Sequence, residues 1–286
     1  MKNIHLKNLS VLVLATLFIS TSGVLGKYIA LPSEIIIWFR AFIAMLFLYL
    51  FCTYKNIDLK IKSTKDYIPF LISGVFMAAH WVTYFYALKL SNVALGVLSL
   101  YTFPVITALL EPVFLRVKFN PVHIFLAFLV FTGIYILTPE FNLESAQLQG
   151  ILFGVFSAFC YTIRILILKK HVSNNNGIML MFYQTLIVSV VLLPTLFFMD
   201  FSGLLSQLPY LFLLAILTTA LGHTLMLQSL KHFSATTTAI VSSLQPVFGI
   251  ILAFFFLSEL PSINVYLGGS LILLTAIIEG VRSNKK

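Results

Sequence analysis

The sequence is poor in charge. Only 9% of its 286 residues are charged, while 60% are apolar and the mean hydropathy is +1.02. Soluble domains carry about 25% charged residues, so this chain has too few charges to cover the surface of a water-soluble fold. The composition therefore disfavours soluble enzymes, nucleic-acid-binding modules and disordered proteins.

Cysteine and catalytic motifs are also scarce. The two cysteines, Cys52 and Cys160, lie inside apolar runs, which disfavours a disulfide framework or a zinc site and favours small buried side chains. The chain has no P-loop, Gly-x-Ser-x-Gly or His-Glu-x-x-His motif. We therefore expect no enzymatic activity, no cofactor and no metal. Without an ATP-binding motif, any process in this protein that requires energy must draw it from ion or substrate gradients.

Long apolar runs are what the sequence has in abundance. A helix needs about 20 apolar residues to cross a bilayer, and inside a bilayer such runs must be helical to satisfy their backbone hydrogen bonds. The sequence thus predicts an all-α membrane protein with ten transmembrane helices, in which residues 1–286 form one domain. The first run is interpreted as an uncleaved helix, because no Ala-x-Ala-like site ends it. The predicted spans are residues 9–29, 34–54, 67–88, 91–115, 120–138, 148–168, 177–198, 207–229, 234–257 and 262–281.

Lysine and arginine predict the orientation, since they gather in cytoplasmic loops. With the N-terminus inside, nearly all of the 18 basic residues fall on the cytoplasmic side. Only Lys27 and Lys89 fall in the opposite loops, and Arg40 and Arg164 lie within spans. We expect a multi-pass protein of the plasma (inner) membrane with both termini in the cytoplasm. The net charge of +9 is then a sign of topology rather than of nucleic-acid binding.

The two halves of the chain resemble each other. Pro104-Val105 aligns with Pro246-Val247, and the order of spans matches between residues 1–140 and 141–286, approximately. Each half has five predicted helices, so the second half must cross the membrane upside down. Inverted repeats place a binding site near the midplane between the halves, and rocking about that site gives alternating access. This pattern predicts a transporter.

Three stretches also carry a resemblance to a known family. They are Trp38-Phe39-Arg40-Ala41, Ala87-Leu88-Lys89-Leu90-Ser91-Asn92-Val93-Ala94, and Pro246 followed by Phe255-Phe256-Leu257-Ser258-Glu259. With ten spans in two inverted halves, nearly the whole chain resembles the EamA-type drug/metabolite transporters. The resemblance implies export of amino acids, other small metabolites or drugs. It also implies a central cavity lined mainly by the third, fourth, eighth and ninth helices.

The first half departs from the family pattern. The family has an acid after the fourth-helix proline, as Glu259 follows Pro246, but Val117 holds that place in the first half. The acid nearest to it is Glu111. Glu111 is a candidate for proton coupling, because burial raises a carboxyl pKa. It can equally pair with Arg116 or Lys118 at the membrane surface.

Polar residues inside the spans are the candidates for a binding site, because they are expected to face the interior. His80 and Tyr84 lie four residues apart on one helical face, and we expect them to orient a solute. His80 is a second candidate for proton coupling. Arg40 fits a carboxylate site, a structural pair or a side chain that extends toward the outer surface of the membrane, and His223 fits a solute contact or a structural hydrogen bond. The predicted substrate-binding residues are Arg40, His80, Trp81, Tyr84, Tyr101, Tyr161, Tyr183, Gln184, His223 and Gln245.

Other residues have predicted structural roles. Pro104 and Pro246 are expected to kink their helices and to act as paired hinges, or as static bends. Gly150 and Gly154 fit close helix packing. Arg164, near a span end, is expected to extend toward the membrane surface.

The sequence therefore predicts a secondary-active transporter, which exports a small metabolite such as an amino acid through a central cavity. A passive channel or facilitator is the first alternative. Ion conductance would indicate a channel, whereas saturable counterflow would indicate a carrier. A membrane-embedded enzyme or a scaffold is less consistent with an inverted repeat. The expected partners are a small solute and the lipid bilayer, without nucleic acid. The small-residue stripes fit contacts within one subunit or in a homodimer.

Overall fold

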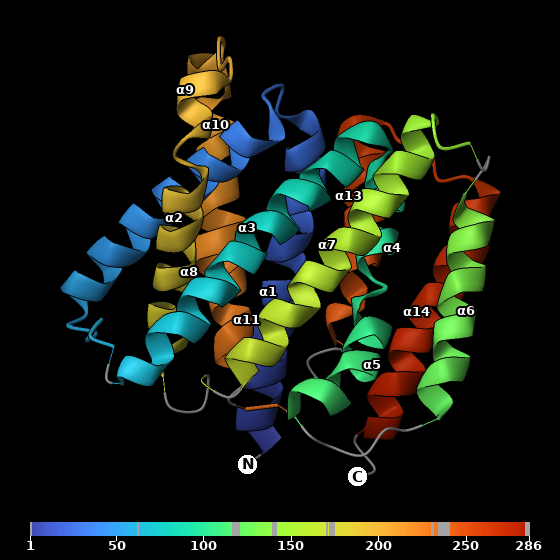
Figure 1. Ribbon diagram of the computed structural model, residues 1–286, viewed down its shortest axis with the longest axis horizontal. Coiled ribbons are helices and arrows are strands. Elements are labelled where there is room, and N and C mark those ends of the chain that lie inside the picture. Colours follow the sequence, from blue (N-terminus) through green and yellow to red (C-terminus); the bar gives the residue numbers. More distant parts are fainter. Residues whose placement is uncertain are drawn as a thin grey trace.

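The apolar runs of the sequence form a bundle of helices (Figure 1). The computed structural model describes residues 2–61, 63–115, 121–138, 142–169, 171, 175–229, 232–233 and 241–283, and over these ranges it has no strand. The prediction of an all-α fold is confirmed. The first half contains α1 (Lys2–Tyr28), α2 (Ser33–Tyr54), η1 (Thr64–Asp66), α3 (Tyr67–Leu90), α4 (Val93–Leu100), α5 (Phe103–Leu115) and α6 (Val122–Leu137).

The second half continues with long and short helices. Its elements are α7 (Ala146–Lys169), α8 (Gly177–Leu192), α9 (Thr195–Phe198), α10 (Leu204–Leu213), η2 (Leu214–His223), α11 (Thr224–Ser229), α13 (Leu244–Leu257) and α14 (Ile263–Ser283). Among the described residues, 7 helical segments are long and apolar enough to cross a membrane, and α6, α13 and Ile263–Thr275 are shorter apolar helices.

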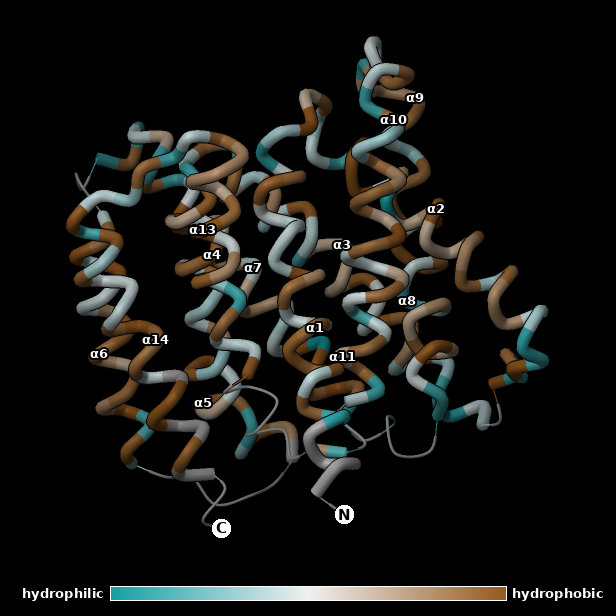
Figure 2. The backbone as a smooth tube through the Cα atoms, turned by 180° about the vertical axis from the view of Figure 1, so that it is seen from behind, coloured by the Kyte–Doolittle hydropathy of each residue, from teal (hydrophilic) through white to brown (hydrophobic). Residues whose placement is uncertain are grey.

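Large apolar side chains cover the outside of the bundle. Phe128, Phe131 and Tyr135 of α6 are mostly exposed, as are Phe255 and Phe256 of α13. Figure 2 shows hydrophobic residues along nearly every helix. A soluble protein rarely exposes such large apolar patches, so this surface is suited to contact with lipid. The chain is a multi-pass membrane protein.

Both ends of the described chain lie at the same end of the bundle. In Figures 1 and 2, α1 begins and α14 ends near the labels N and C. The segment between α2 and α3, which contains Lys55, Lys60 and Lys65, lies at this end as well. We call this end of the bundle, where the described chain begins and ends, the basic end. Lys27 and Lys89 lie at the other end, where α1 and α3 stop.

The fourth span is broken just before its proline. α4 ends at Leu100, a turn covers Tyr101 and Thr102, and Pro104 is the second residue of α5. The ninth span also has a turn at Ser243, directly before α13. Pro246 is the third residue of that helix. Backbone N–H groups in a first helical turn have no partner within the helix. Neither proline therefore removes a hydrogen bond within its helix, and each break precedes the proline by two or three residues.

The glycines of α7 allow close packing against α3 and α4, as predicted. A Cβ atom added to Gly150 would lie 2.8 Å from Ser91 Cβ, and one added to Gly154 would overlap the side chain of Ser99. This close approach brings Ser157 and Tyr161, further along α7, to the face of α3 that carries His80.

Candidate functional site

A cavity lies between the helices, with about 640 Å³ of empty space among its lining atoms, part of which is open to the outside. Its walls come from α1, α2, α3, α4, η2 and α11, with Phe103, Tyr161, Ser242 and Gln245 completing them. Helices of the third, fourth, eighth and ninth spans thus contribute, as the family resemblance implied. The predicted residues that line the cavity are Arg40, His80, Trp81, Tyr84, Tyr101, Tyr161, His223 and Gln245.

His80 is oriented by α7. The Ser157 hydroxyl donates to the His80 carbonyl oxygen at 2.8 Å, and the same hydroxyl oxygen lies 2.7 Å from His80 Nδ1. Because that hydroxyl hydrogen is already used, Nδ1 must be the donor in the second contact. In a neutral ring, Nε2 is then an acceptor. The ring also lies parallel to Tyr84, with centroids 6.3 Å apart, and beside Tyr161 at 4.9 Å.

Arg40 also lines the cavity and is almost fully buried. Its Nε donates to Thr219 Oγ1 at 2.6 Å, and Nη1 donates to Ser22 Oγ at 3.3 Å. Nη2 lies 3.3 Å from His223 Nε2. Since arginine is only a donor, His223 accepts through Nε2. The guanidinium also covers the ring of Trp81, with Cζ 4.1 Å from the ring centroid, which is a cation–π contact.

The partners of Arg40 depend on an unusual helix. η2 is a π-helix that contains both Thr219 and His223. π-Helical turns are rare and often occur at functional sites. Here the π-helix places the Thr219 hydroxyl and the His223 imidazole on one helical face, where both contact the Arg40 guanidinium.

Tyr101 joins the two halves of the chain across the cavity. It lies in the turn between α4 and α5, and its hydroxyl donates to the carbonyl oxygen of Ser242. The same hydroxyl lies 2.5 Å from Gln245 Oε1. These contacts link the break in the fourth span to the ninth span.

Two predicted site residues lie outside the cavity. The Tyr183 hydroxyl donates to the Leu59 carbonyl oxygen at 2.7 Å, so it holds the segment before α3. Gln184 is buried and accepts from Arg164 Nε at 2.7 Å. Its amide nitrogen donates to Ser73 Oγ at 3.3 Å. Arg164 is therefore buried rather than extended to the surface, and that prediction is wrong.

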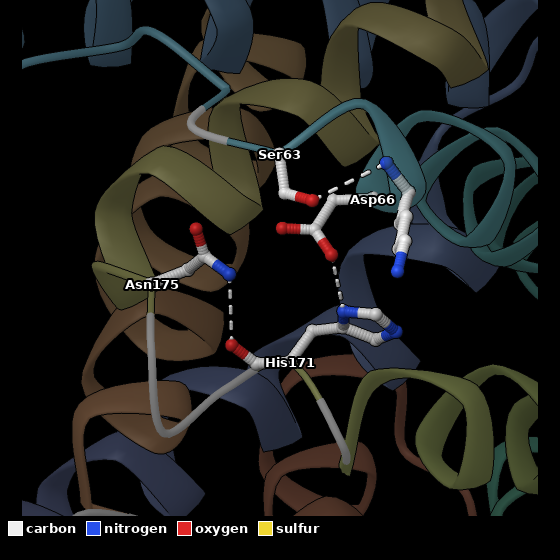
Figure 3. Close-up of polar contacts among 5 residues, drawn as sticks. Ser63, Asp66, His171 and Asn175 are labelled. Carbon is white, nitrogen blue, oxygen red and sulfur yellow. Dashed lines mark hydrogen bonds and ion pairs between the residues drawn. The ribbon is translucent and has the colours of Figure 1, made fainter.

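Glu111 also lies away from the cavity, near the basic end. It forms an ion pair with Lys169, and its side chain is 33% exposed. Arg116 and Lys118, its expected alternative partners, lie outside the described residues. At the same end, His171 Nδ1 lies 2.8 Å from Asp66 Oδ1 (Figure 3). The Asn175 side chain donates to the His171 carbonyl oxygen at 2.9 Å. These contacts join η1 to the connection between α7 and α8.

The sequence did not identify several residues that complete the site. Ser157, Thr219 and Ser22 hold His80 and Arg40, but hydroxyl residues in membrane helices are most often packing residues. The spacing of Thr219 and His223 was a usable signal, because both residues lie on one helical face. Phe103 and Met226 also line the cavity, although single apolar residues carry no signal in so apolar a chain.

The chain matches known proteins over most of its length. The model of the EamA-like transporter family matches the chain twice, over residues 6–138 and 148–279. An S-adenosylmethionine uptake transporter of Rickettsia felis is 26% identical over 93% of this chain and 90% of its own. The pseudopaline exporter CntI of Pseudomonas aeruginosa is 27% identical over 93% of each chain.

A solved structure, titled only as the crystal structure of a protein, shares the fold. Its TM-score is 0.69 at 16% identity, over 98% of both chains. The relatives are named as transporters, which supports a transporter rather than an enzyme. Since the family model covers most of the sequence in two consecutive matches, this chain belongs to the EamA-like transporter family.

Proposed function

We propose that the protein is a secondary-active carrier that exports a small metabolite, such as an amino acid, by alternating access through the central cavity. One observation carries the proposal: side chains of both halves meet in the wall of a single cavity. Arg40 contacts His223, and Tyr101 contacts Gln245. A solute bound there contacts both halves, which is what a carrier needs when the halves rock about the bound solute.

The proposed topology has ten spans in two inverted repeats, approximately residues 1–140 and 141–286. The long and short apolar helices supply enough segments for this topology. The two family matches divide the chain near the same boundary. An even number of spans agrees with the start of α1 and the end of α14 lying together. The lysines of the basic end favour the cytoplasmic side of the inner membrane.

Relatives differ in the direction of transport that their names give. One is named for uptake of S-adenosylmethionine and another for export of pseudopaline. Both names describe movement of a small molecule. Export is our proposal for this chain, and S-adenosylmethionine and the amino acids are the first solutes to test.

Within the cavity, His80 and Tyr84 are proposed to orient the solute, with Arg40 and Gln245 assisting. His80 is suited to this role because α7 fixes its ring. Proton antiport is part of the proposal, and His80 is now a better candidate for it than Glu111. His80 lines the cavity, whereas Glu111 is paired with Lys169 outside it.

Counterflow in proteoliposomes tests the proposal. Vesicles loaded with an unlabelled solute should accumulate the labelled solute, and the exchange should saturate. His80→Ala should reduce this exchange at least tenfold, because the mutant loses the oriented imidazole. The matched control is His232→Ala, since His232 is exposed and does not line the cavity. An imposed pH gradient should change the net flux. Ion conductance without counterflow would indicate a channel and contradict the carrier.

A further inference from the structure

Arg40 is a buried cation without a counter-ion among the described residues. Its side chain is 1% exposed. The ion pairs found in the described part of the chain are Lys169–Glu111 and His171–Asp66, and neither includes Arg40. Charges inside a membrane are costly and normally pair with one another. A guanidinium stays protonated at neutral pH, so this charge needs compensation from elsewhere.

The neighbours of Arg40 leave part of its donor capacity free. Of the five N–H groups of a guanidinium, one goes to each of Thr219, Ser22 and His223. All three acceptors are neutral groups. Within the described residues, one N–H therefore remains on each of Nη1 and Nη2. Two N–H groups on adjacent nitrogens match the two oxygens of a carboxylate, which arginine binds bidentately.

The cavity around Arg40 is suited to a single negative charge. Among the described residues, no acidic side chain lines the cavity, and Arg40 is the one lysine or arginine in its wall. Arg164, the other buried arginine, is bonded to Gln184 and does not line the cavity. One cation balances one carboxylate, whereas a phosphate dianion would leave a second charge unpaired.

We infer that Arg40 is the carboxylate-recognition residue of the cavity, so that the solutes carried are small monocarboxylates, amino acids included. The carboxylate supplies the counter-ion that the described residues do not provide, and the Trp81 ring packs against the guanidinium and helps to hold it in place. This inference rests on the proposed transport function and names the chemical group that the transport site recognises.

Trp81 provides a direct measurement of binding. The chain has two tryptophans, and Trp38 lies outside the cavity with its indole N–H donating to the Ser189 carbonyl oxygen. Trp38→Phe therefore leaves one fluorophore, which contacts Arg40. The full-length variant in lipid nanodiscs is titrated with amino acids and short monocarboxylates. Each amino acid is paired with its own amide, as in leucine with leucinamide and methionine with methioninamide.

We expect at least one acid to shift Trp81 emission saturably, and its amide to bind at least tenfold more weakly. Such a factor is expected when a charged hydrogen-bonded pair is lost. Equal affinity for an acid and its amide would overturn the inference. An emission that responds to no carboxylate in the set would overturn it as well.

Two arginine variants test whether the preference for the acid over its amide depends on Arg40. Arg40→Gln should abolish the preference for the acid, while Arg164→Gln, which also removes a buried cation, should retain it. If Arg40→Gln does not fold, Arg40→Lys serves in its place, and it should weaken the preference because lysine lacks the planar fork. A preference unchanged in the Arg40 variant would overturn the inference.

Counterflow separates this inference from the proposed function. Exchange of amines, nucleosides or sugars without any preference for carboxylates would retain a carrier and overturn the role of Arg40. Carboxylate binding that depends on Arg40, without any counterflow, would support the role of Arg40 and contradict the carrier.

Discussion

At the scale of the residue, neighbouring hydroxyl groups help to orient the imidazole of His80 and the guanidinium of Arg40. Ser157 both accepts from His80 Nδ1 and donates to the His80 carbonyl oxygen, so α7 sets the tautomer and the plane of the ring. The Thr219 hydroxyl accepts from the Nε of Arg40 and so helps to fix the guanidinium. A solute in the cavity therefore meets a fixed acceptor on His80 and fixed donors on Arg40.

We predict that Ser157→Ala raises the KM for counterflow about three- to tenfold with little loss of stability. The variant loses the short contact of Nδ1 and keeps a longer one, 3.2 Å to the Ser157 carbonyl oxygen. One neutral hydrogen bond contributes about 0.5–1.5 kcal/mol, which sets this range. Ser189→Ala is the matched control, since its hydroxyl bonds only within α8, to the Thr185 carbonyl oxygen. Equal KM values for both variants would contradict the role of Ser157.

The sequence predicted most of the cavity residues for a physical reason. Imidazole, guanidinium and indole groups at mid-span must avoid lipid, so His80, Arg40 and Trp81 were expected to face inward. Tyr183 and Gln184 were placed wrongly because α8 has polar side chains without a periodic pattern that shows which face is buried. The partners of Arg40 were missed for another reason, since a serine or threonine in an apolar helix gives no indication of what it contacts.

At the scale of the element, the acid shared with the family links two helices at the end opposite the basic end. Glu259 follows α13, and its carboxylate accepts from the backbone N–H of Val93, the first residue of α4, at 2.9 Å. Asn92 caps the same helix by accepting from Leu95 N. A negative charge is favourable at a helix N-terminus, so Glu259 attaches the end of the ninth span to the start of the fourth.

We predict that Glu259→Ala opens the cavity toward the end of the molecule at which Glu259 lies. Losing a hydrogen bond to a charged acceptor costs about 1.5 kcal/mol or more, which is about tenfold in a two-state equilibrium. Leu100 lines the cavity, and the measurement uses the Leu100→Cys variant. An impermeant thiol reagent is applied from that side, and the rate at which it modifies the introduced cysteine is recorded. Cys52 and Cys160, both buried, are replaced by alanine first.

Two further variants test this prediction. Glu259→Gln keeps an acceptor and should increase the rate less than Glu259→Ala. Glu144→Gln removes an exposed acid from the connection before α7 and should leave the rate unchanged. If Glu259→Ala also leaves the rate unchanged, the contact with α4 does not hold the cavity closed.

The positions of the long apolar helices could be predicted from the sequence, but the breaks in helical structure could not. Twenty apolar residues fix where a helix crosses a membrane. The turn at Tyr101–Thr102 and the π-helix from Leu214 to His223 change only the backbone hydrogen-bond pattern, and hydropathy does not report that pattern. Pro104 and Pro246 were the residues in the sequence that indicated a change in the helices, and each lies shortly after a break and not within it.

At the scale of the whole molecule, the breaks in the fourth and ninth predicted spans are in direct contact in the wall of the cavity. Tyr101, in the first break, is bonded to Ser242 and Gln245, which lie on either side of the turn at Ser243. Corresponding places in two halves of one chain are thus joined directly. A rocking motion of the halves would need the backbone to bend where regular helical hydrogen bonding is already interrupted.

We predict that Pro104→Ala and Pro246→Ala each slow counterflow several-fold while the protein stays folded. Each proline lies in a first helical turn, where its fixed φ restricts the backbone at no cost in helical hydrogen bonds. Alanine gives the break more freedom and allows the helix to extend across it, which should shift the balance between inward-facing and outward-facing forms. Turnover of the purified variants in proteoliposomes measures the change, and thermal unfolding checks that they are folded.

Pro112→Ala is the matched control, because Pro112 lies inside α5, away from the break. It should leave the turnover near that of the unmodified protein. In an inverted repeat the two halves exchange roles during transport. A pair of corresponding hinges therefore leads to a second expectation. If one variant slows the step that opens the cavity to one side, the other should slow the step that opens it to the opposite side. Unchanged transport in both proline variants would exclude the hinges, and an effect of Pro104→Ala alone would restrict the hinge to the first half.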